Sequence, residues 1–202
     1  MRPTDVAGVV LAAGEGRRFG GFKALACYQG TRMVDLAVVA LAQAGVTERL
    51  VVTHPGWPTS SYDEIDATVA VNPDWAQGMG SSLRLALGHP LAQGRSGAVL
   101  LLADQPLVGS ACVSRVLVAA SGTDALVQAT YSGRRGHPVL IGAEHWAGVV
   151  AGAAGDVGAR PYLAGHAAQV VLVDCADIGH DADVDTVEEL GALAARRPSG
   201  RT

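Results

Sequence analysis

Short, continuously apolar segments alternate with segments of helical periodicity along the chain, and this alternation limits the possible folds more than any other feature. A strand that is apolar at consecutive positions is buried on both faces, as in a parallel sheet covered by helices on two sides. We expect strands at residues 6–13, 49–53, 68–71, 98–103, 125–130, 139–141 and 169–174. We expect helices at residues 32–44, 81–87, 110–120, 144–150, 158–164 and 186–196. The pattern predicts an α/β fold, a single three-layer α/β/α domain with a mostly parallel, Rossmann-like sheet.

The length of 202 residues is typical of one compact domain. We therefore expect one domain over residues 1–202, with frayed ends at residues 1–5 and 196–202. A net charge of −4 gives no general positive field, so nucleic acid is not an expected partner. No apolar run reaches the roughly 20 residues of a membrane helix, and no leader segment opens the chain. We expect a cytoplasmic protein that does not contact membranes.

A Gly-rich segment, residues 14–23, follows the first expected strand and is the strongest candidate for a binding site. In open sheets of this kind, ligands bind beyond the carboxyl ends of the strands. The segment holds four glycines and three cations. Glycines let the backbone fold closely around an oxyanion, and Arg and Lys neutralise its charge. The segment predicts a polyphosphate site; the alternative is a flexible surface loop with solvated arginines.

Other well-known sites do not fit the sequence. The dinucleotide fingerprint G-x-G-x-x-G, counted from Gly14, has Phe19 at its last position, and Lys23 lacks the flanking residues of a P-loop. These mismatches argue against a dinucleotide-binding dehydrogenase and a P-loop NTPase. The three cysteines form no Cys-x-x-Cys pair and the histidines lack metal-ligand spacing, which argues against a zinc site. Among the histidines, His137 is the one we single out, because it lies between Gly136 and Pro138.

Carboxylates in two places could bind a metal ion. Asp104 directly follows the expected strand at residues 98–103. A carboxylate at a strand end can hold Mg²⁺ by one oxygen while water and substrate phosphates complete the octahedron. Asp181, Asp183 and Asp185 form a separate acidic group. Asp104 could instead be a turn or cap residue and the acidic group a solvated loop, but the strand-end position favours a metal site.

These segments together resemble the molybdenum cofactor nucleotidyltransferases, and most closely their cytidylyltransferase branch. The family's opening pattern, L-A-A-G-x-S-x-R-M-G-x-x-K, is matched at Leu11, Ala12, Ala13, Gly14, Arg18, Gly20 and Lys23. Gly16 and Phe19 depart from it, where the family has Ser and Met. The likeness continues in order through residues 72–75, 78–82, 102–106, 136–140, 155–160 and 183–189, so it spans nearly the whole chain.

The resemblance implies a sheet of the nucleotide-diphospho-sugar transferase type and a Mg²⁺-dependent reaction. CMP would pass from CTP to the terminal phosphate of molybdopterin, with release of pyrophosphate. The catalytic residues implied are Arg18, Lys23 and Asp104, with Asp183 or Asp185 as a second metal ligand beside Asp104. The implied nucleotide-binding residues are Leu11, Ala12, Ala13, Gly14 and Gly16 for the phosphates, and Gly80, Ser81 and Ser82 for the base. Ala13 stands where guanylyl-transferring relatives more often carry Gly, which favours CTP over GTP.

The segment at residues 155–160 is implied to bind the acceptor, through Asp156 and Arg160. Gly158 would open a short helix whose N–H groups face an anion. From spacing alone, an Asp156 helix cap with an Arg160 salt bridge explains the segment equally well, and the resemblance favours the acceptor.

The resemblance implies as partners CTP, molybdopterin, and a molybdenum hydroxylase or its chaperone. It leaves two alternative functions open. One is an NAD(P)H-dependent oxidoreductase of a quinone-like pigment, and the other is a non-catalytic carrier or chaperone of the molybdenum cofactor.

Overall fold

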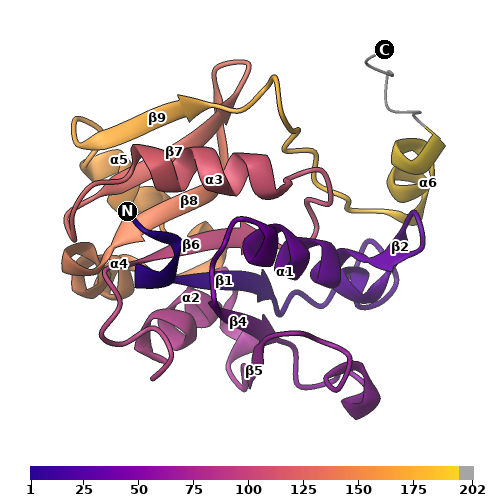
Figure 1. Ribbon diagram of the computed structural model, residues 1–202. Helices are drawn as coiled ribbons and strands as arrows, with labels where there is room; N and C mark the ends of the chain where they lie inside the picture. Colours follow the sequence, from indigo (N-terminus) through magenta and orange to yellow (C-terminus); the bar gives the residue numbers. More distant parts are fainter. Residues whose placement is uncertain (196–202) are drawn as a thin grey trace.

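Seven strands form one central sheet in the computed structural model, which describes residues 1–195 (Figure 1). The strands are β1 (Val6–Ala12), β4 (Glu48–Thr53), β5 (Thr68–Val71), β6 (Gly97–Leu102), β7 (Leu126–Tyr131), β8 (Arg134–Gly142) and β9 (Val170–Asp174). Their spatial order is β5-β4-β1-β6-β8-β7-β9, and β8 runs antiparallel to both of its neighbours. The other pairs are parallel, so the predicted α/β fold with a mostly parallel sheet is confirmed.

Helices cover both faces of the sheet and complete three layers (Figure 1). One face is covered by α1 (Met33–Gln43) and α3 (Ser110–Ala119), and the other by α2 (Met79–Gly88), α4 (Trp146–Gly152) and α5 (Arg160–Gly165). The last helix, α6 (Val187–Ala195), lies apart, beside the small hairpin of β2 (Cys27–Tyr28) and β3 (Thr31–Arg32). The sequence extends this helix to Arg196, which, with the expected frayed end at residues 196–202, lies outside the described residues.

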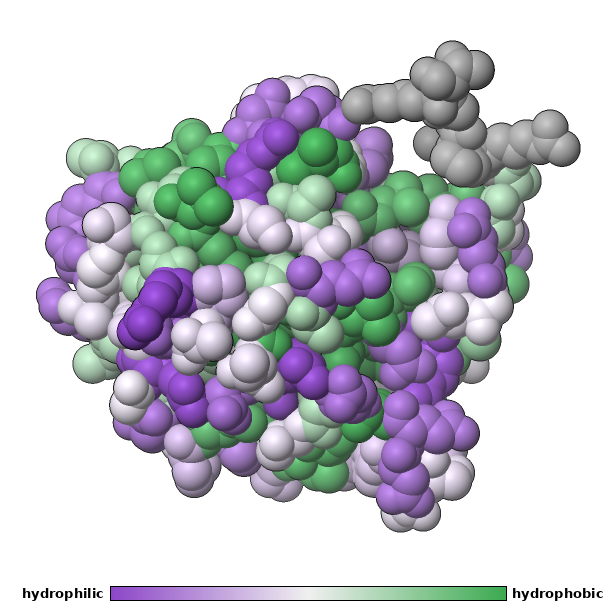
Figure 2. Space-filling view, viewed as in Figure 1, coloured by the Kyte–Doolittle hydropathy of each residue, from purple (hydrophilic) through white to green (hydrophobic). Residues whose placement is uncertain are grey.

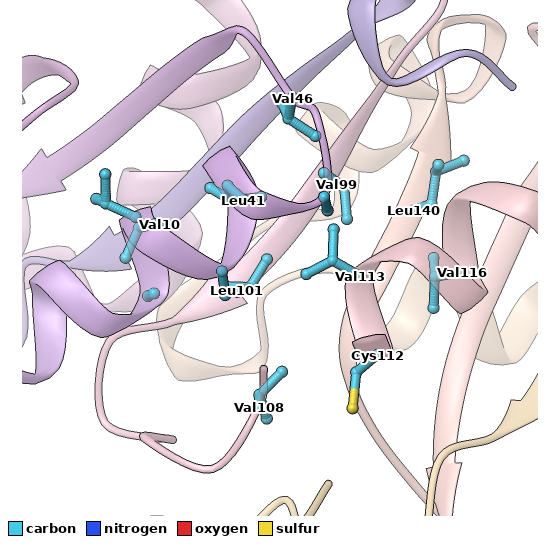
Figure 3. Close-up of a cluster of buried hydrophobic side chains, with 14 of the residues drawn as sticks. Val10, Leu41, Val46, Val99, Leu101, Val108, Cys112, Val113, Val116 and Leu140 are labelled. Carbon is cyan, nitrogen blue, oxygen red and sulfur yellow. The ribbon is translucent and has the colours of Figure 1, made fainter. Parts of the chain in front are cut away.

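The continuous apolar character of β1 follows from burial on both faces. Val10 packs in the cluster between the sheet and helices α1 and α3, which also contains Leu41 and Val113 (Figure 3). Val9, its neighbour in sequence, packs in the opposite cluster against Leu83 of α2. Full burial of each such side chain contributes about 1.5–3 kcal/mol relative to exposure. Both layers therefore hold β1 rigidly below the loop that follows it.

The strand β8 begins five residues earlier than expected, at Arg134 instead of residue 139. The sequence predicts a connector at residues 131–137, but β8 begins at Arg134 and pairs with β7 through Arg135. The turn needs only Ser132 and Gly133, both with positive φ (51° and 81°), as in a tight hairpin. The polar side chains of Arg134 and Arg135 suggested a loop, but their backbone still pairs with Tyr131 and Thr130 of β7.

The second helix begins at Met79, and Ser81 and Ser82 do not cap it. Its N-cap is Gly78, with φ of 87°, and neither serine makes a capping hydrogen bond. The Ser81 hydroxyl instead donates to the Gly78 carbonyl at 2.8 Å. The helix starts earlier because glycine adopts the conformation that the preceding turn requires.

The N-terminal residues 1–5, which the sequence suggests would fray, lie against the domain. The ammonium of Met1 donates to the carbonyls of Leu117 and Ala120 at the end of α3. A cation at a helix C-terminus is stabilised by the helix dipole, so this contact helps to hold the N-terminus against α3.

The described residues 1–195 contain no helix that is both long and apolar enough to span a bilayer. Figure 2 shows hydrophilic and hydrophobic side chains interspersed over the face of the molecule on which α1 and α3 lie.

Candidate active site

A cavity of about 470 Å³ opens where β1 and β6 end. Its wall includes five residues assigned to the phosphates from the sequence: Leu11, Ala12, Ala13, Gly14 and Gly16. Lys23 and Asp104 also line it, as do Ser82 and Asp156. The structure thus gathers residues from four separate segments around one space, at the edge of the sheet where ligands of such folds bind.

Gly16 shapes the Gly-rich loop. Its φ is 68°, and its carbonyl accepts hydrogen bonds from the N–H groups of Phe19 and Gly20 at 2.9 Å and of Gly21 at 3.3 Å. A Cβ at this position would collide with the Gly21 carbonyl. The tight turn in this chain therefore requires glycine at position 16.

Lys23 bridges two carboxylates at the base of the cavity. Its Nζ lies 2.5 Å from Asp104 Oδ2 and 3.0 Å from Asp185 Oδ1, and its side chain is only 18% exposed. Arg18, which is 74% exposed, places Nη2 2.8 Å from the other Asp185 oxygen. Both cations assigned to the phosphates thus meet at Asp185, a residue 162 positions from Lys23 in the chain.

The protonation states of this cluster follow from its ion pairs. Burial alone would lower the pKa of Lys23, but the charges of Asp104 and Asp185 outweigh it and raise the pKa. The hydrogen bond from Lys23 is the main reason that the pKa of Asp185 is lowered. For Asp183, burial raises the pKa, against a hydrogen bond from Gln105, and the neighbouring carboxylates add to the rise. At neutral pH Lys23 is therefore charged and Asp185 ionised.

Asp104 fits a divalent cation better than the other two carboxylates do. Its Oδ1 is buried and has no hydrogen-bond partner in residues 1–195, so this oxygen is available to a cation. Asp185 is engaged by Lys23 and Arg18, and Asp183 accepts a hydrogen bond of 2.8 Å from Gln105 Nε2. Within the described chain no three His, Cys, Asp or Glu residues form a metal-binding group. Mg²⁺ commonly uses one or two carboxylates together with substrate phosphates, so the residues present fit it.

The residues assigned to the base are only partly at the cavity. Ser82 lines the wall, but Gly80 and Ser81 lie behind it. A Cβ at Gly80 would come within 2.8 Å of the Ala153 backbone, so this glycine allows close packing of α2. Asn72 Nδ2 donates to the hydroxyls of Ser81 (2.8 Å) and Ser82 (3.0 Å). The two serines are thus part of a buried network that positions the start of α2.

Trp75 and Arg17 are among the cavity-lining residues that were not assigned from the sequence. Trp75 forms part of its wall, and its ring packs on His54 with centroids 4.1 Å apart. Arg17 lines the cavity, although it is even more exposed than Arg18 (83% against 74%), and it is paired with Glu15 at 2.7 Å. Trp75 ends the family-like run at residues 72–75, which was a signal that could have identified it.

Residues 155–160 lie between this cavity and a second one. Asp156 lines the first, where its Oδ1 accepts a 3.4 Å hydrogen bond from the Met79 N–H. Arg160 lines the second, a space of about 190 Å³. Over residues 1–195 no ion pair joins Asp156 to Arg160, so the salt-bridge interpretation is not supported. The prediction that Gly158 opens a helix is wrong, because α5 begins at Arg160 and Gly158 has a φ of 53°.

Comparisons with known proteins agree with this architecture. The family model described as the MobA-like NTP transferase domain matches residues 8–170. Nicotine blue oxidoreductase of Paenarthrobacter nicotinovorans is 35% identical over 206 residues, covering 96% of this chain and 100% of the relative. The crystal structure of the Mycobacterium tuberculosis Rv0371c homologue from Mycobacterium sp. strain JC1 gives a TM-score of 0.79 at 25% identity, covering 96% of this chain and 97% of that one. Rv0371c from M. tuberculosis H37Rv in complex with manganese gives a TM-score of 0.69 at 26% identity, over 96% of this chain and 100% of that chain.

Proposed function

Because the chain belongs to the MobA-like NTP transferase family and is therefore a nucleotidyltransferase, we propose that it transfers CMP from CTP to the terminal phosphate of molybdopterin. The observation that carries the proposal is the bridge from Lys23 to Asp104 and Asp185 at the base of the first cavity. It places one cation and two carboxylates beside a glycine loop that has room for a triphosphate. Membership of the family supports a nucleoside triphosphate as substrate. The choice of CTP as this triphosphate and of molybdopterin as the acceptor is our proposal.

The reaction forms one bond and breaks one bond. An oxygen of the molybdopterin phosphate attacks the α-phosphorus of CTP, and the bond from that phosphorus to the bridging oxygen breaks, which releases pyrophosphate. The attacking phosphate is already ionised at pH 7, so no side chain has to remove a proton. The rate then comes mainly from alignment and from neutralisation of charge.

Lys23 and the backbone of residues 14–17 would hold the triphosphate, and Arg18 would neutralise its outer end. These cations are paired with Asp185 in the structure, so the incoming phosphates would replace that carboxylate. Asp104, with Asp185 or Asp183 as a second ligand, would hold a divalent cation. When bound, Mg²⁺ would neutralise the charge that develops on the α-phosphate and the leaving pyrophosphate. The manganese complex of Rv0371c supports a divalent ion.

The test is pyrophosphate release from CTP or GTP, with Mg²⁺ and molybdopterin. We expect release with CTP that depends on the acceptor, and a rate with GTP lower by about tenfold or more, since buried polar groups left unpaired by the wrong base disfavour it. Ala13, whose identity favours CTP by the resemblance, and Ser82 both line the cavity. Equal or faster turnover of GTP would contradict the assignment of the base.

A second candidate function is NAD(P)H-dependent reduction of a quinone-like pigment. It is favoured by the 35% identity, over the full length, to a protein named nicotine blue oxidoreductase. Oxidation of NAD(P)H by the pigment, without pyrophosphate release from CTP, would select it. Binding of molybdopterin without either reaction would select the carrier function instead.

For the acceptor, we expect Arg160→Ala to weaken molybdopterin binding by about tenfold, because a charge-assisted contact to phosphate is lost. CTP binding should not change, since Arg160 lines the second cavity and not the first. Thermal shift with CTP and Mg²⁺, and titration with molybdopterin, measure the two affinities. The matched control is Arg2→Ala, an exposed arginine paired with Asp5. Loss of CTP binding with retained pterin affinity would place this segment at the nucleotide.

A further inference from the structure

The second cavity adjoins the first, and the two share the side chains of Leu11, Met79 and Leu102. Its volume of about 190 Å³ is well below the range of roughly 300–1,000 Å³ for sites that take a drug-sized ligand. A triphosphate with its nucleoside would not fit, but one flat ring system would. Apolar side chains from β6, β8 and α5 form much of the wall: Leu100, Leu102, Val139 and Leu163.

Gln128 contributes an unsatisfied acceptor to this cavity. It lies on β7, is 8% exposed, and its Nε2 donates to the Gly136 carbonyl at 3.4 Å. This long hydrogen bond turns Nε2 towards a carbonyl, and Oε1 is buried without a partner in the described part of the chain. The ladder between β7 and β8 shifts register directly after Gln128, a local irregularity of the kind that redirects side chains beside functional sites.

Gln105 contributes a second unsatisfied acceptor. It is 7% exposed, and its Nε2 donates to Asp183 Oδ1 at 2.8 Å and more weakly to the Asp181 carbonyl at 3.5 Å. Both partners are acceptors, so the amide orientation is fixed. Its Oε1 is also buried without a partner in residues 1–195. Buried acceptors are normally satisfied, and two of them on one cavity indicate a ligand with N–H donors on its edge.

The arginines of the cavity indicate that the ligand also carries an anionic group. Three arginines line it, and Arg134 is paired with Asp181 at 3.0 Å. Arg135 and Arg160 form no ion pair with any residue in the described range. His137 also lines the cavity, where burial lowers its pKa to about 4, so the imidazole is neutral at pH 7. The unpaired positive charge therefore belongs to the arginines, which suit a phosphate.

We propose that the second cavity binds the pterin ring of the acceptor, with the amide oxygens of Gln105 and Gln128 accepting hydrogen bonds from its ring N–H and amino groups. The assignment rests on the proposed transfer to molybdopterin and adds the residues that recognise the ring. Arg135 and Arg160, which line the same cavity, hold the phosphate.

Fluorescence titration of the full chain with pterin-6-carboxylate, without nucleotide, tests the assignment. We expect binding by the wild type and a dissociation constant about tenfold higher for Gln128→Met, which keeps the shape but removes the acceptor. Gln169→Met, at an exposed glutamine just before β9, is the matched control and should bind as the wild type does. Quinoxaline, a bicyclic ring without N–H groups, should not bind measurably.

Thermal shift with CTP separates this assignment from the proposed function. Equal pterin affinity in the wild type, Gln128→Met and Gln105→Met would overturn the assignment, as would a wild type that binds CTP but no pterin. If Gln128→Met does not fold, Gln105→Met decides by the same criterion. Pterin binding that depends on these glutamines, without any pyrophosphate release, would support the ring site and contradict the transfer reaction.

Discussion

Replacing Asp104 by asparagine should lower the rate of pyrophosphate release by about a hundredfold or more and leave the fold intact. One carboxylate oxygen pairs with Lys23 at 2.5 Å and the other is buried without a partner in residues 1–195. An amide has nearly the same shape but cannot neutralise either Lys23 or a cation. The Asp104 carbonyl, which accepts a 2.9 Å hydrogen bond from the Val184 N–H, is unchanged by the substitution. The structural connection from β6 to the C-terminal segment therefore survives.

Single-turnover and steady-state pyrophosphate assays, with circular dichroism melting of each protein, measure the two effects. Asp66→Asn is the matched control, because Asp66 is an exposed carboxylate paired with Arg49 far from the cavity. A near-normal rate in Asp104→Asn would remove this residue from the site. Unfolding of the variant would instead assign Asp104 a structural role.

Replacing Lys23 by alanine should weaken CTP binding by about tenfold to a hundredfold, the effect of losing one charge-assisted contact. The melting temperature should fall only modestly at neutral pH, where Asp104 and Asp185 are left facing each other without a cation. Isothermal titration with CTP and Mg²⁺ gives the affinity per folded molecule. If Lys23→Ala instead destabilises the fold while its folded fraction binds CTP as tightly as the wild type does, Lys23 has a structural role.

The pH dependence of that stability difference has a defined sign. Lys23 lowers the pKa of Asp185 in the folded state, so this stabilisation is present above the unfolded pKa of about 4 and is lost as pH falls through the folded value. The pKa of Lys23 is raised, so its contribution is present below the unfolded value of about 10.4 and is lost as pH rises beyond it. Wild type and Lys23→Ala should therefore differ most between about pH 4 and 10 and converge in acid. A difference that grows in acid would contradict the ion pairs.

The residues of the first cavity that follow β1 and β6 could be predicted, because the ends of buried strands are evident from the sequence. Apolar runs at consecutive positions define β1 and β6, and the polar residues after them must lie at the carboxyl edge of the sheet. Lys23 and Asp104 are therefore at the cavity, as expected. The resemblance also implied Asp183 or Asp185 beside Asp104, but the sequence did not predict that Asp185 pairs with both Lys23 and Arg18.

The second cavity could not be predicted, for a similar reason. Gln128 lies within an otherwise apolar strand, and an isolated polar residue there gives no signal of its partners. The sequence predicted a connector at residues 131–137, whereas these residues include the start of β8, which brings Arg135 and His137 to the same cavity as Gln128. The helix at Gly158 was misplaced because the sequence pattern does not reveal that both glycines of the segment, Gly155 and Gly158, adopt positive φ values (50° and 53°).

The lysine in the bridge is also the only lysine in the sequence. Apart from the chain's N-terminal amine, it is the one primary amine that reductive methylation could modify, so a ¹³C-methyl label would enter at the base of the cavity. The added methyl groups keep the positive charge while reporting on its surroundings. The chemical shift of that single side chain would then follow, without any further mutation, the exchange of a carboxylate partner for a phosphate as nucleotide enters.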